Sequence, residues 1–226
     1  YKEMKSLETI ADMKITPRPK DSQEVIELIE LFSYKDNFIT KQSYCKVRIC
    51  ARGDKTLTNI SIYSPVAGHV GVRIFAAICL KFPITKQGDF STAFLSGRSD
   101  AWIYYELPSG HKLRESMNGK RCNYVWRTKC TIYGLGNAEH SWYSTFEEYL
   151  REFGFVTLFS ESCLFIHRNS KDQIDMILLL YVDDILYSGE HDIVAEFEKE
   201  LKNRFKMKST SEIESYIQSK YIFIES

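Results

Sequence analysis

Hydrophobic residues recur with two different periods along this chain, and together they predict a mixture of helices and strands. A three- or four-residue period predicts helices over about residues 137–153 and 192–205, and a mostly buried helix over 70–82. In the 192–205 segment acidic residues lead and Lys and Arg trail, which matches the helix dipole. The apolar stripes of the first two helices consist of Trp142, Phe146, Tyr149, Leu150 and Phe153, and of Ile193, Phe197, Leu201 and Phe205.

Shorter segments have the pattern of strands. YCKVRICARGD (44–54) alternates apolar and basic positions and predicts a half-buried strand with a basic face, followed by a turn at RGD. A short strand is predicted over 84–89, and CLFIHRN and MILLLYV, near a polar turn at 168–173, are typical of antiparallel strands. Asp21 and Glu24 have capping-box spacing ahead of VIELIELF, which favours a helix and leaves a strand possible. The mixture indicates an α/β or α+β fold.

Composition narrows the class of protein. The 226 residues, 44% of them hydrophobic, are enough for one large domain or two coupled subdomains. Thirty basic and thirty acidic residues give a net charge of zero, so a nucleic-acid partner must be held by a local basic surface. The six cysteines include no C-x-x-C pair and no zinc-type spacing with histidine, which predicts reduced thiols in an intracellular protein.

The ends and the hydropathy of the chain add two expectations. No run of residues is long and apolar enough for a membrane span, and the N-terminus is too polar for a secretion signal. Because the chain starts with Tyr and lacks an initiator Met, we expect it to be a fragment of a longer protein.

The stretch MILLLYVDDILYSGE contains the strongest candidates for catalytic residues. Its apolar run meets two adjacent aspartates, Asp183 and Asp184, and then resumes. Adjacent carboxylates repel each other, and a divalent cation such as Mg²⁺ relieves that repulsion because it binds carboxylate and phosphate oxygens. A two-metal site needs a further carboxylate, and Asp89 ends a short strand in a similar setting. The alternative is a tight turn, in which Asp is common.

Six stretches, taken together and in order over about residues 44–188, resemble the reverse transcriptases of copia-type (Pseudoviridae) LTR retrotransposons. LLLYVDDILYSG resembles the Y-x-D-D box, and QGDFSTAFLSG resembles the first aspartate box, Q-x-D-V-x-T-A-F-L-N-G. The others are KVRICARGD, IYYELPSG, IYGLGNAEHSWY and ESCLFIHR. The resemblance implies an RNA- and DNA-templated DNA polymerase from a Pol polyprotein, which transfers dNTPs to a primer 3′-hydroxyl.

The resemblance also implies a fold. It is the α+β right-hand polymerase fold, whose palm has an antiparallel sheet packed on helices. Fingers would occupy about residues 1–86 and 98–135 and the palm about 87–97 and 136–226, with thumb and RNase H absent from this chain. A strand, not a helix, is implied near residue 30, and we adopt that interpretation.

The resemblance implies a set of site residues in this chain. It also implies two bound Mg²⁺ ions, for which Mn²⁺ can substitute. The catalytic carboxylates would be Asp89, Asp183 and Asp184, joined as metal ligands by the backbone oxygen of Phe90. The incoming nucleotide would meet Lys46, Arg48, Arg52, Phe94 and Asn137, with Phe94 as the gate against a 2′-hydroxyl, and Tyr181 would lie near the primer and template. Alternatively, Phe94 is a core residue and Lys46 and Arg48 belong to a solvated strand face.

Departures from the family pattern keep a second interpretation open. Gly136 and Asn137 stand where the family has Lys and Gln, and Tyr216-Ile217-Gln218 stands where the family has L-G-I. The alternative is therefore an impaired or inactive retroelement remnant, at most a nucleic-acid-binding or structural protein. The first interpretation implies a primed RNA or DNA template, dNTPs and the RNase H and integrase of the parent Pol polyprotein as partners. The implied location is cytoplasmic, in a virus-like particle.

Overall fold

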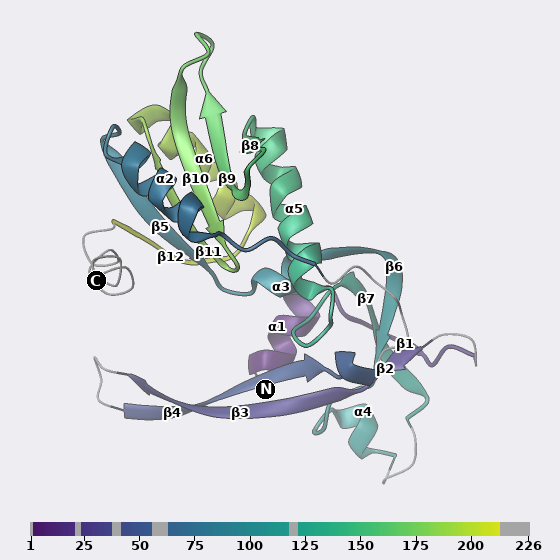
Figure 1. The fold of residues 1–226 in the computed structure, drawn as a ribbon. Coiled ribbons are helices and arrows are strands. Elements are labelled where there is room, and N and C mark those ends of the chain that lie inside the picture. The colour runs from purple at the N-terminus through teal and green to yellow at the C-terminus, as the bar shows by residue number, and fades with distance from the viewer. Residues whose placement is uncertain (1, 21–23, 38–41, 56–62, 118–121, 213–226) are drawn as a thin grey trace. The chain divides into compact units, whose positions relative to one another are not determined.

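The computed structural model describes residues 2–20, 24–37, 42–55, 63–117 and 122–212 (Figure 1). The chain forms two compact units, each built from two stretches of sequence. Unit 1 comprises residues 1–63 and 94–145, and unit 2 comprises residues 64–93 and 146–226. The chain passes between the units at three points, and two of these lie within the helices α3 (Ala93–Ser96) and α5 (Ala138–Phe153).

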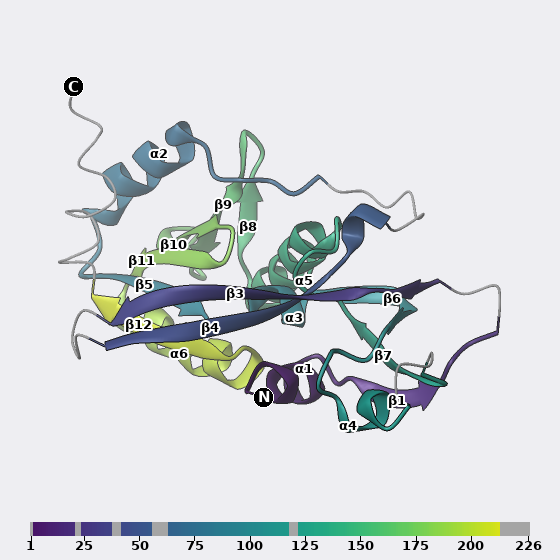
Figure 2. The same ribbon diagram turned by 90° about the horizontal axis from the view of Figure 1, so that it is seen from below.

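Unit 1 contains a four-stranded sheet and a long two-stranded ribbon (Figures 1 and 2). The sheet has the order β1 (Lys14–Pro17), β7 (Tyr124–Cys130), β6 (Arg98–Tyr105) and β2 (Val25–Ile26), and only the β2–β6 pair is parallel. The ribbon pairs β3 (Leu28–Asn37) with β4 (Gln42–Ala51). The remaining elements are α1 (Lys2–Ile10), the 3-10 turn Gly53–Lys55 and α4 (Lys112–Glu115).

The capping-box prediction of a helix over VIELIELF is wrong, and the strand implied by the family resemblance is present. Ten residues of β3 pair in register with β4, so the ribbon satisfies backbone groups that a helix would have satisfied internally. Asp21 lies outside the described residues. The predicted strand at 44–54 is confirmed as part of β4, and RGD begins the turn after it.

The core of unit 1 joins α1 to the sheet. Leu7 of α1 is completely buried in the same cluster as Tyr105 and Trp126, which face each other across β6 and β7. Fully burying an aliphatic side chain contributes about 1.5–3 kcal/mol, so Leu7 adds to the packing of α1 on the sheet. Other members of the cluster are Leu95, Leu107, Cys130 and Ile132.

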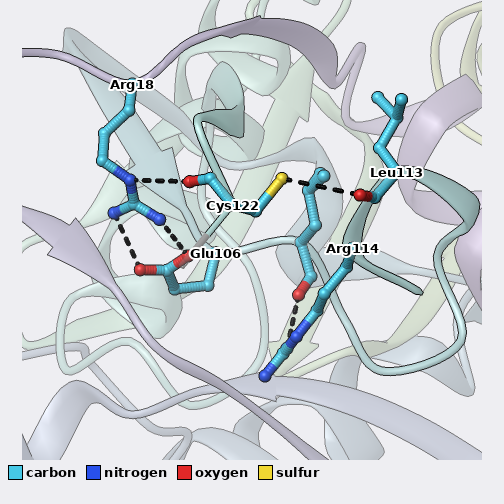
Figure 3. Close-up of polar contacts among 6 residues, drawn as sticks. Arg18, Glu106, Leu113, Arg114 and Cys122 are labelled. Atoms are coloured by element: carbon cyan, nitrogen blue, oxygen red, sulfur yellow. Dashed lines mark hydrogen bonds and ion pairs between the residues drawn. The ribbon is translucent and has the colours of Figure 1, made fainter. Parts of the chain in front are cut away.

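A buried ion pair fixes the segment that follows β6 (Figure 3). The guanidinium of Arg18 donates two bonds to the carboxylate of Glu106, at 2.8 and 2.5 Å, and its Nε donates to the carbonyl of Cys122 at 3.0 Å. Arg114 of α4 donates to the carbonyl of Leu107 at 2.6 Å. Because the Arg18 side chain is only 13% exposed, this pair joins the N-terminal segment to both ends of the 106–122 connection.

Unit 2 is a six-stranded antiparallel sheet with helices on both faces (Figures 1 and 2). The strand order is β12 (Met207–Glu212), β5 (Ile84–Phe90), β11 (Asp184–Gly189), β10 (Ile174–Tyr181), β9 (Glu161–Arg168) and β8 (Val156–Leu158). Helix α2 (His69–Cys79) covers one face and α6 (His191–Arg204) the other. Among the described residues, no helix is long and apolar enough to cross a membrane.

The apolar run of β10 is explained by its place in the sheet. The five residues 176–180 are at most 2% exposed, since β9 and β11 flank the strand and helices cover it on both faces. A strand buried on both faces loses the polar alternation of a half-exposed strand. The sequence predictions of β9, β10, α5 and α6 are confirmed. The prediction that α2 is mostly buried is wrong, because only Gly71, Phe75 and Cys79 of that helix are buried.

Aromatic side chains join β5 to the two helices behind it. Phe90 meets Phe146 of α5 edge to face at 5.2 Å between ring centroids, and it meets Phe205 at 5.7 Å. Tyr149 and Phe197 extend this cluster along α5 and α6. Such pairs add about 0.5–1.5 kcal/mol beyond the area that they bury. The cluster therefore anchors the end of β5, the strand that carries Asp89.

Two buried tyrosines give a matched test of hydrogen bonding in the core. The Tyr105 hydroxyl is buried and has no hydrogen-bond partner in the described part of the chain, whereas the Tyr187 hydroxyl donates to Glu198 at 3.0 Å. We expect Tyr105→Phe to raise the free energy of unfolding by about 1 kcal/mol and Tyr187→Phe to lower it by about 1–2 kcal/mol. Urea titration of both variants measures this, and a destabilised Tyr105→Phe would contradict it.

Glu198 gives unit 2 a dependence on acid pH. Burial acts to raise the pKa of this carboxyl, but hydrogen bonds from Lys86 and Tyr187 and the charges of Lys86 and Lys202 outweigh it, so the pKa lies below 4.5. A lowered pKa contributes stability above the unfolded value and loses it as pH falls through the folded value. We expect Glu198→Gln to be less stable than wild type at pH 7, with the difference shrinking below pH 4.5 in denaturation curves. A difference independent of pH would refute this.

Candidate active site

The doubled aspartate lies at a two-residue hairpin turn. Tyr181, the last residue of β10, pairs with Asp184, the first residue of β11, which leaves Val182 and Asp183 as the turn. Val182 has a φ of 57°, which is unusual for a β-branched residue and costs about 1–3 kcal/mol. The tight-turn alternative is therefore correct for the local backbone, and it does not exclude a metal site. Asp183 is exposed at the turn, and Tyr181 is 43% exposed.

The third predicted carboxylate lies directly opposite the second. Asp89 of β5 is the register partner of Asp184 of β11, so both side chains project from the same face of the sheet with Cβ atoms about 4.5–5.5 Å apart. The backbone N–H of Phe90 donates to the carbonyl of Asp183 at 3.3 Å. On its other edge, Asp89 pairs with Ser209 of β12. Two strands distant in sequence thus bring Asp89, Asp183 and Asp184 together.

The donors fit a hard divalent cation, although they are not arranged as a finished metal site. Within the described ranges, no group of three or more His, Cys, Asp or Glu side chains is close enough to hold a metal as it stands. The facing carboxylates of Asp89 and Asp184 supply the oxygen ligands that Mg²⁺ prefers. Asp183 would complete the set by turning its exposed side chain toward them. The carbonyl of Phe90 stays a predicted ligand, while its ring is buried in the aromatic cluster.

In unit 1, the basic strand β4 carries two of the predicted nucleotide contacts. Lys46 and Arg48 are two residues apart and share a face of the ribbon. Glu3 of α1 lies near both: burial raises the pKa of its carboxyl, while the N–H of Ile49 and the charges of Lys46 and Arg48 act to lower it. The guanidinium of Arg52 donates to Asp54 at 2.9 and 2.8 Å, so its charge is already paired.

A hollow of about 770 Å³ opens beside this strand. Its lining includes Lys46, together with the carboxylates of Glu3 and Glu30 and the rings of Phe32 and Tyr44. A triphosphate is attracted by a positive local potential, and the two carboxylates lower that potential in the hollow. The hollow therefore combines one predicted phosphate contact, Lys46, with acidic side chains that oppose a triphosphate.

Tyr133 connects Arg48 to the predicted gate residue. Arg48 lies over the Tyr133 ring, 5.6 Å from its centroid, and the same ring meets Phe94 edge to face at 5.2 Å. Thr131 fixes the backbone of Phe94 by donating to its carbonyl at 2.9 Å. Phe94 is half-buried, so it is neither a fully buried core residue nor freely exposed. Sequence reasoning missed Tyr133, and its place directly before the glycines of YGLG was the available signal.

Close glycine packing holds this arrangement in place. The N–H of Ala51, at the end of β4, donates to the carbonyl of Tyr133 at 2.7 Å. Gly134 has a φ of +89°, and a Cβ there would lie 2.3 Å from the carbonyl oxygen of Ala51. A Cβ on Gly53 would lie 2.1 Å from the carbonyl oxygen of Gly134. The RGD and YGLG stretches therefore pack backbone to backbone, which only glycine permits.

Asn137 is less available than the nucleotide-binding prediction requires. It precedes α5, is only 8% exposed, and its carbonyl accepts the N–H of Ser141 at 2.9 Å. The structure thus brings Asp89, Phe90, Tyr181, Asp183 and Asp184 together in unit 2. It brings Arg48, Phe94 and Tyr133 together in unit 1.

Comparison with known proteins gives a consistent match. The family model described as reverse transcriptase (RNA-dependent DNA polymerase) matches residues 12–224. The chain is 27% identical over 225 residues to a retrovirus-related Pol polyprotein from transposon TNT 1-94 of Nicotiana tabacum, covering 97% of this chain and 16% of that protein. It is 29% and 28% identical over 209 residues to retrovirus-related Pol polyproteins from transposons RE2 and RE1 of Arabidopsis thaliana. These matches cover 90% of this chain and 14% of each relative.

Proposed function

The chain belongs to the reverse transcriptase family, in the form carried by the Pol polyproteins of copia-like transposons, and from this we propose that it is a polymerase core adding dNTPs to a primer 3′-hydroxyl. Template RNA or DNA would direct the addition. We propose unit 1 as the fingers and unit 2 as the palm. Helix α2 goes with the palm, because it packs on β9, β10 and β11.

The register of Asp89 opposite Asp184, with Asp183 beside them, is the observation that carries this proposal. Nucleotidyl transfer needs carboxylates that hold divalent ions between the primer hydroxyl and the triphosphate. When bound, two Mg²⁺ ions supply the charge that activates the hydroxyl and steadies the leaving pyrophosphate. The protein's own contribution is to hold Asp89 and Asp184 opposite each other at the end of a buried sheet, with Asp183 in the adjoining turn, from which its side chain would turn toward them when the ions bind.

Unit 1 supplies the contacts to the nucleotide in this proposal. Lys46 and Arg48 neutralise the triphosphate, and Tyr133 holds the Arg48 guanidinium through a cation–π contact. The same ring supports Phe94 edge to face, which keeps the gate residue in one orientation. Phosphate binding and sugar selection would therefore share one aromatic support.

Primer extension tests the proposal. The substrate is poly(rA) primed with oligo(dT), with dTTP and either Mg²⁺ or Mn²⁺. Extension by the wild-type chain that Asp183→Asn/Asp184→Asn lacks supports a polymerase. No extension by a folded chain that still binds the primed template contradicts it and favours the alternative below.

The gate gives a separate prediction about selectivity. Phe94→Ala is expected to raise incorporation of UTP relative to dTTP by about 10- to 100-fold, because the ring no longer opposes the 2′-hydroxyl. Single-nucleotide extension with each substrate measures the ratio. Tyr63→Ala, which removes another exposed ring of unit 1, serves as the control and should leave the ratio unchanged. If Phe94→Ala leaves the ratio of UTP to dTTP incorporation unchanged, Phe94 is not the gate and serves only in packing.

A second candidate function is a non-catalytic remnant that binds nucleic acid or is structural. One observation favours it: Asn137, in the position of the family's nucleotide-contacting glutamine, is largely buried. Asn137→Gln separates the two functions, since a longer amide should restore extension to an impaired polymerase and leave a remnant inactive. The cytoplasmic location and the RNase H and integrase partners belong to the proposed polymerase as part of a longer Pol polyprotein.

A further inference from the structure

The outer face of the four-stranded sheet in unit 1 carries an aromatic and cationic cluster that the active site does not use. Residues of β6 and β7 alternate between the buried core and this face: Tyr105 and Trp126 point into the core, and their neighbours Tyr104 and Arg127 point outward as register partners. Trp102 also points outward and is 46% exposed. Figure 1 labels the four strands of this sheet.

Two cations lie over the Trp102 ring. The guanidinium carbon of Arg127 lies 4.3 Å from the ring centroid, and the Nζ of Lys129 lies 5.4 Å from it. In the part of the chain that the structure describes, neither cation forms an ion pair, and the Nε of Arg127 has no hydrogen-bond partner. Lys14, the register partner of Arg127 on β1, is already paired with Asp12.

We propose that this face binds single-stranded nucleic acid, with Trp102 stacking on a base and Arg127 and Lys129 holding the adjacent phosphates. A half-exposed indole supplies the flat apolar surface that a base requires. The planar fork of Arg127 matches a phosphate in geometry, and in the described part of the chain its Nε has no hydrogen-bond partner. The inference rests on the proposed function, to which it adds a contact for the unpaired part of a template.

The chemistry favours a single strand over other anions. A duplex hides its base faces inside the stack, so it gives the Trp102 ring nothing to stack on. A free phosphate or an acidic peptide uses the cations and leaves the exposed ring without a partner. Only a strand with accessible bases and a regular phosphate backbone engages all three side chains.

Tryptophan fluorescence gives a direct assay, because the three tryptophans differ sharply in exposure. Trp102 is 46% exposed, whereas Trp126 and Trp142 are at most 1% exposed. A ligand that stacks on an indole should therefore quench mainly Trp102. The probe is a dT oligomer of about 15 nucleotides, within the range of site sizes for stacking platforms. It is titrated into the full chain at several salt concentrations, with circular dichroism and thermal melting as checks of folding.

The variant Arg127→Gln/Lys129→Gln should weaken binding at least about tenfold. It should also lower the slope of log K against log salt by about 1.4, since each phosphate contact to a single strand contributes about 0.7. The control Lys5→Gln/Lys112→Gln removes the same charge from exposed positions on α1 and α4 of the same unit. It should keep most of the affinity, which separates a defined site from net charge.

A second pair of variants isolates stacking from charge. Trp102→Phe keeps an aromatic ring and Trp102→Leu removes it, so anisotropy with a fluorescein-labelled oligomer should give near wild-type affinity for the first and about tenfold weaker binding for the second. Equal affinities of Trp102→Phe and Trp102→Leu would overturn the proposal. A loss of affinity in Lys5→Gln/Lys112→Gln as large as that in Arg127→Gln/Lys129→Gln would also overturn it. Tighter binding of a blunt duplex than of the single strand would also overturn it.

The binding assay tests the proposed surface and primer extension tests the proposed polymerase, so a negative result in one does not imply a negative result in the other. A chain that extends primers, but whose oligomer binding is unaffected by Arg127→Gln/Lys129→Gln, retains the proposed function and rejects this surface. A chain that does not extend primers, but loses oligomer binding only in that variant, retains the surface and rejects the polymerase.

Discussion

Replacing Asp89 with Asn is expected to lower the rate of primer extension by about 1000-fold or more. The carboxylate faces Asp184 across β5 and β11, and the amide has similar size but no charge with which to hold a divalent ion. Metal stabilisation of the developing charge is worth several kcal/mol, and each 1.36 kcal/mol corresponds to a factor of ten in rate. Single-turnover extension at saturating Mg²⁺ measures the effect on chemistry apart from binding.

Asp172→Asn is the matched control for this substitution. Asp172 lies in the hairpin between β9 and β10 of the same sheet, is exposed, and has a φ of 60° that asparagine tolerates. It should leave the rate within about twofold of wild type, as expected for an exposed substitution worth about 0.5 kcal/mol or less. Equal rates for Asp89→Asn and Asp172→Asn would refute a catalytic role for Asp89, provided that both proteins melt at the wild-type temperature.

Gly134→Ala is expected to destabilise unit 1 by about 3 kcal/mol or more. The left-handed backbone alone costs a residue with a Cβ about 1–2 kcal/mol. The added carbon would also lie 2.3 Å from the Ala51 oxygen, a contact that forces β4 and the YGLG stretch apart. Because this separation moves Tyr133 away from Arg48, the surviving folded protein should also have a higher KM for dNTP with a smaller change in kcat.

Gly136→Ala provides the comparison for that effect. It lies two residues further along, is exposed, and does not have a positive φ, so a methyl group there should change the free energy of unfolding by less than about 1 kcal/mol. Urea titrations of the two variants and of wild type measure the difference. Equal stability of Gly134→Ala and Gly136→Ala would show that the close approach at Ala51 is relieved at little cost.

Local pattern predicted much of the fold, because several elements carry their own signals. The helices α5 and α6 have long apolar stripes, and β10 has an apolar run that marks it as central. The β3 segment misled a purely local interpretation, since its apolar spacing suits a helix and only pairing with β4 decides for a strand. The pairing brings together backbone groups from two segments, which no local window contains.

The site was predictable in its residue types and not in its geometry. The six family-like stretches identified Asp89, Asp183 and Asp184, but the register that sets Asp89 against Asp184 depends on two strands distant in sequence. The contact between Arg48 and Tyr133 was hidden for the same reason. The burial of Asn137 depends on how the start of α5 packs, which its sequence position does not reveal.

The burial of β10 on both faces has a consequence for the order in which unit 2 opens. Amide protons of residues 176–180 are bonded within the sheet and shielded by helices, so they should exchange with solvent only when the whole unit unfolds. The turn at Val182 and Asp183 begins at the end of this slowest-exchanging segment. The strained turn is therefore held in place by the end of β10. Asp89, Asp183 and Asp184 should keep their spacing during any partial unfolding in which β10 stays folded.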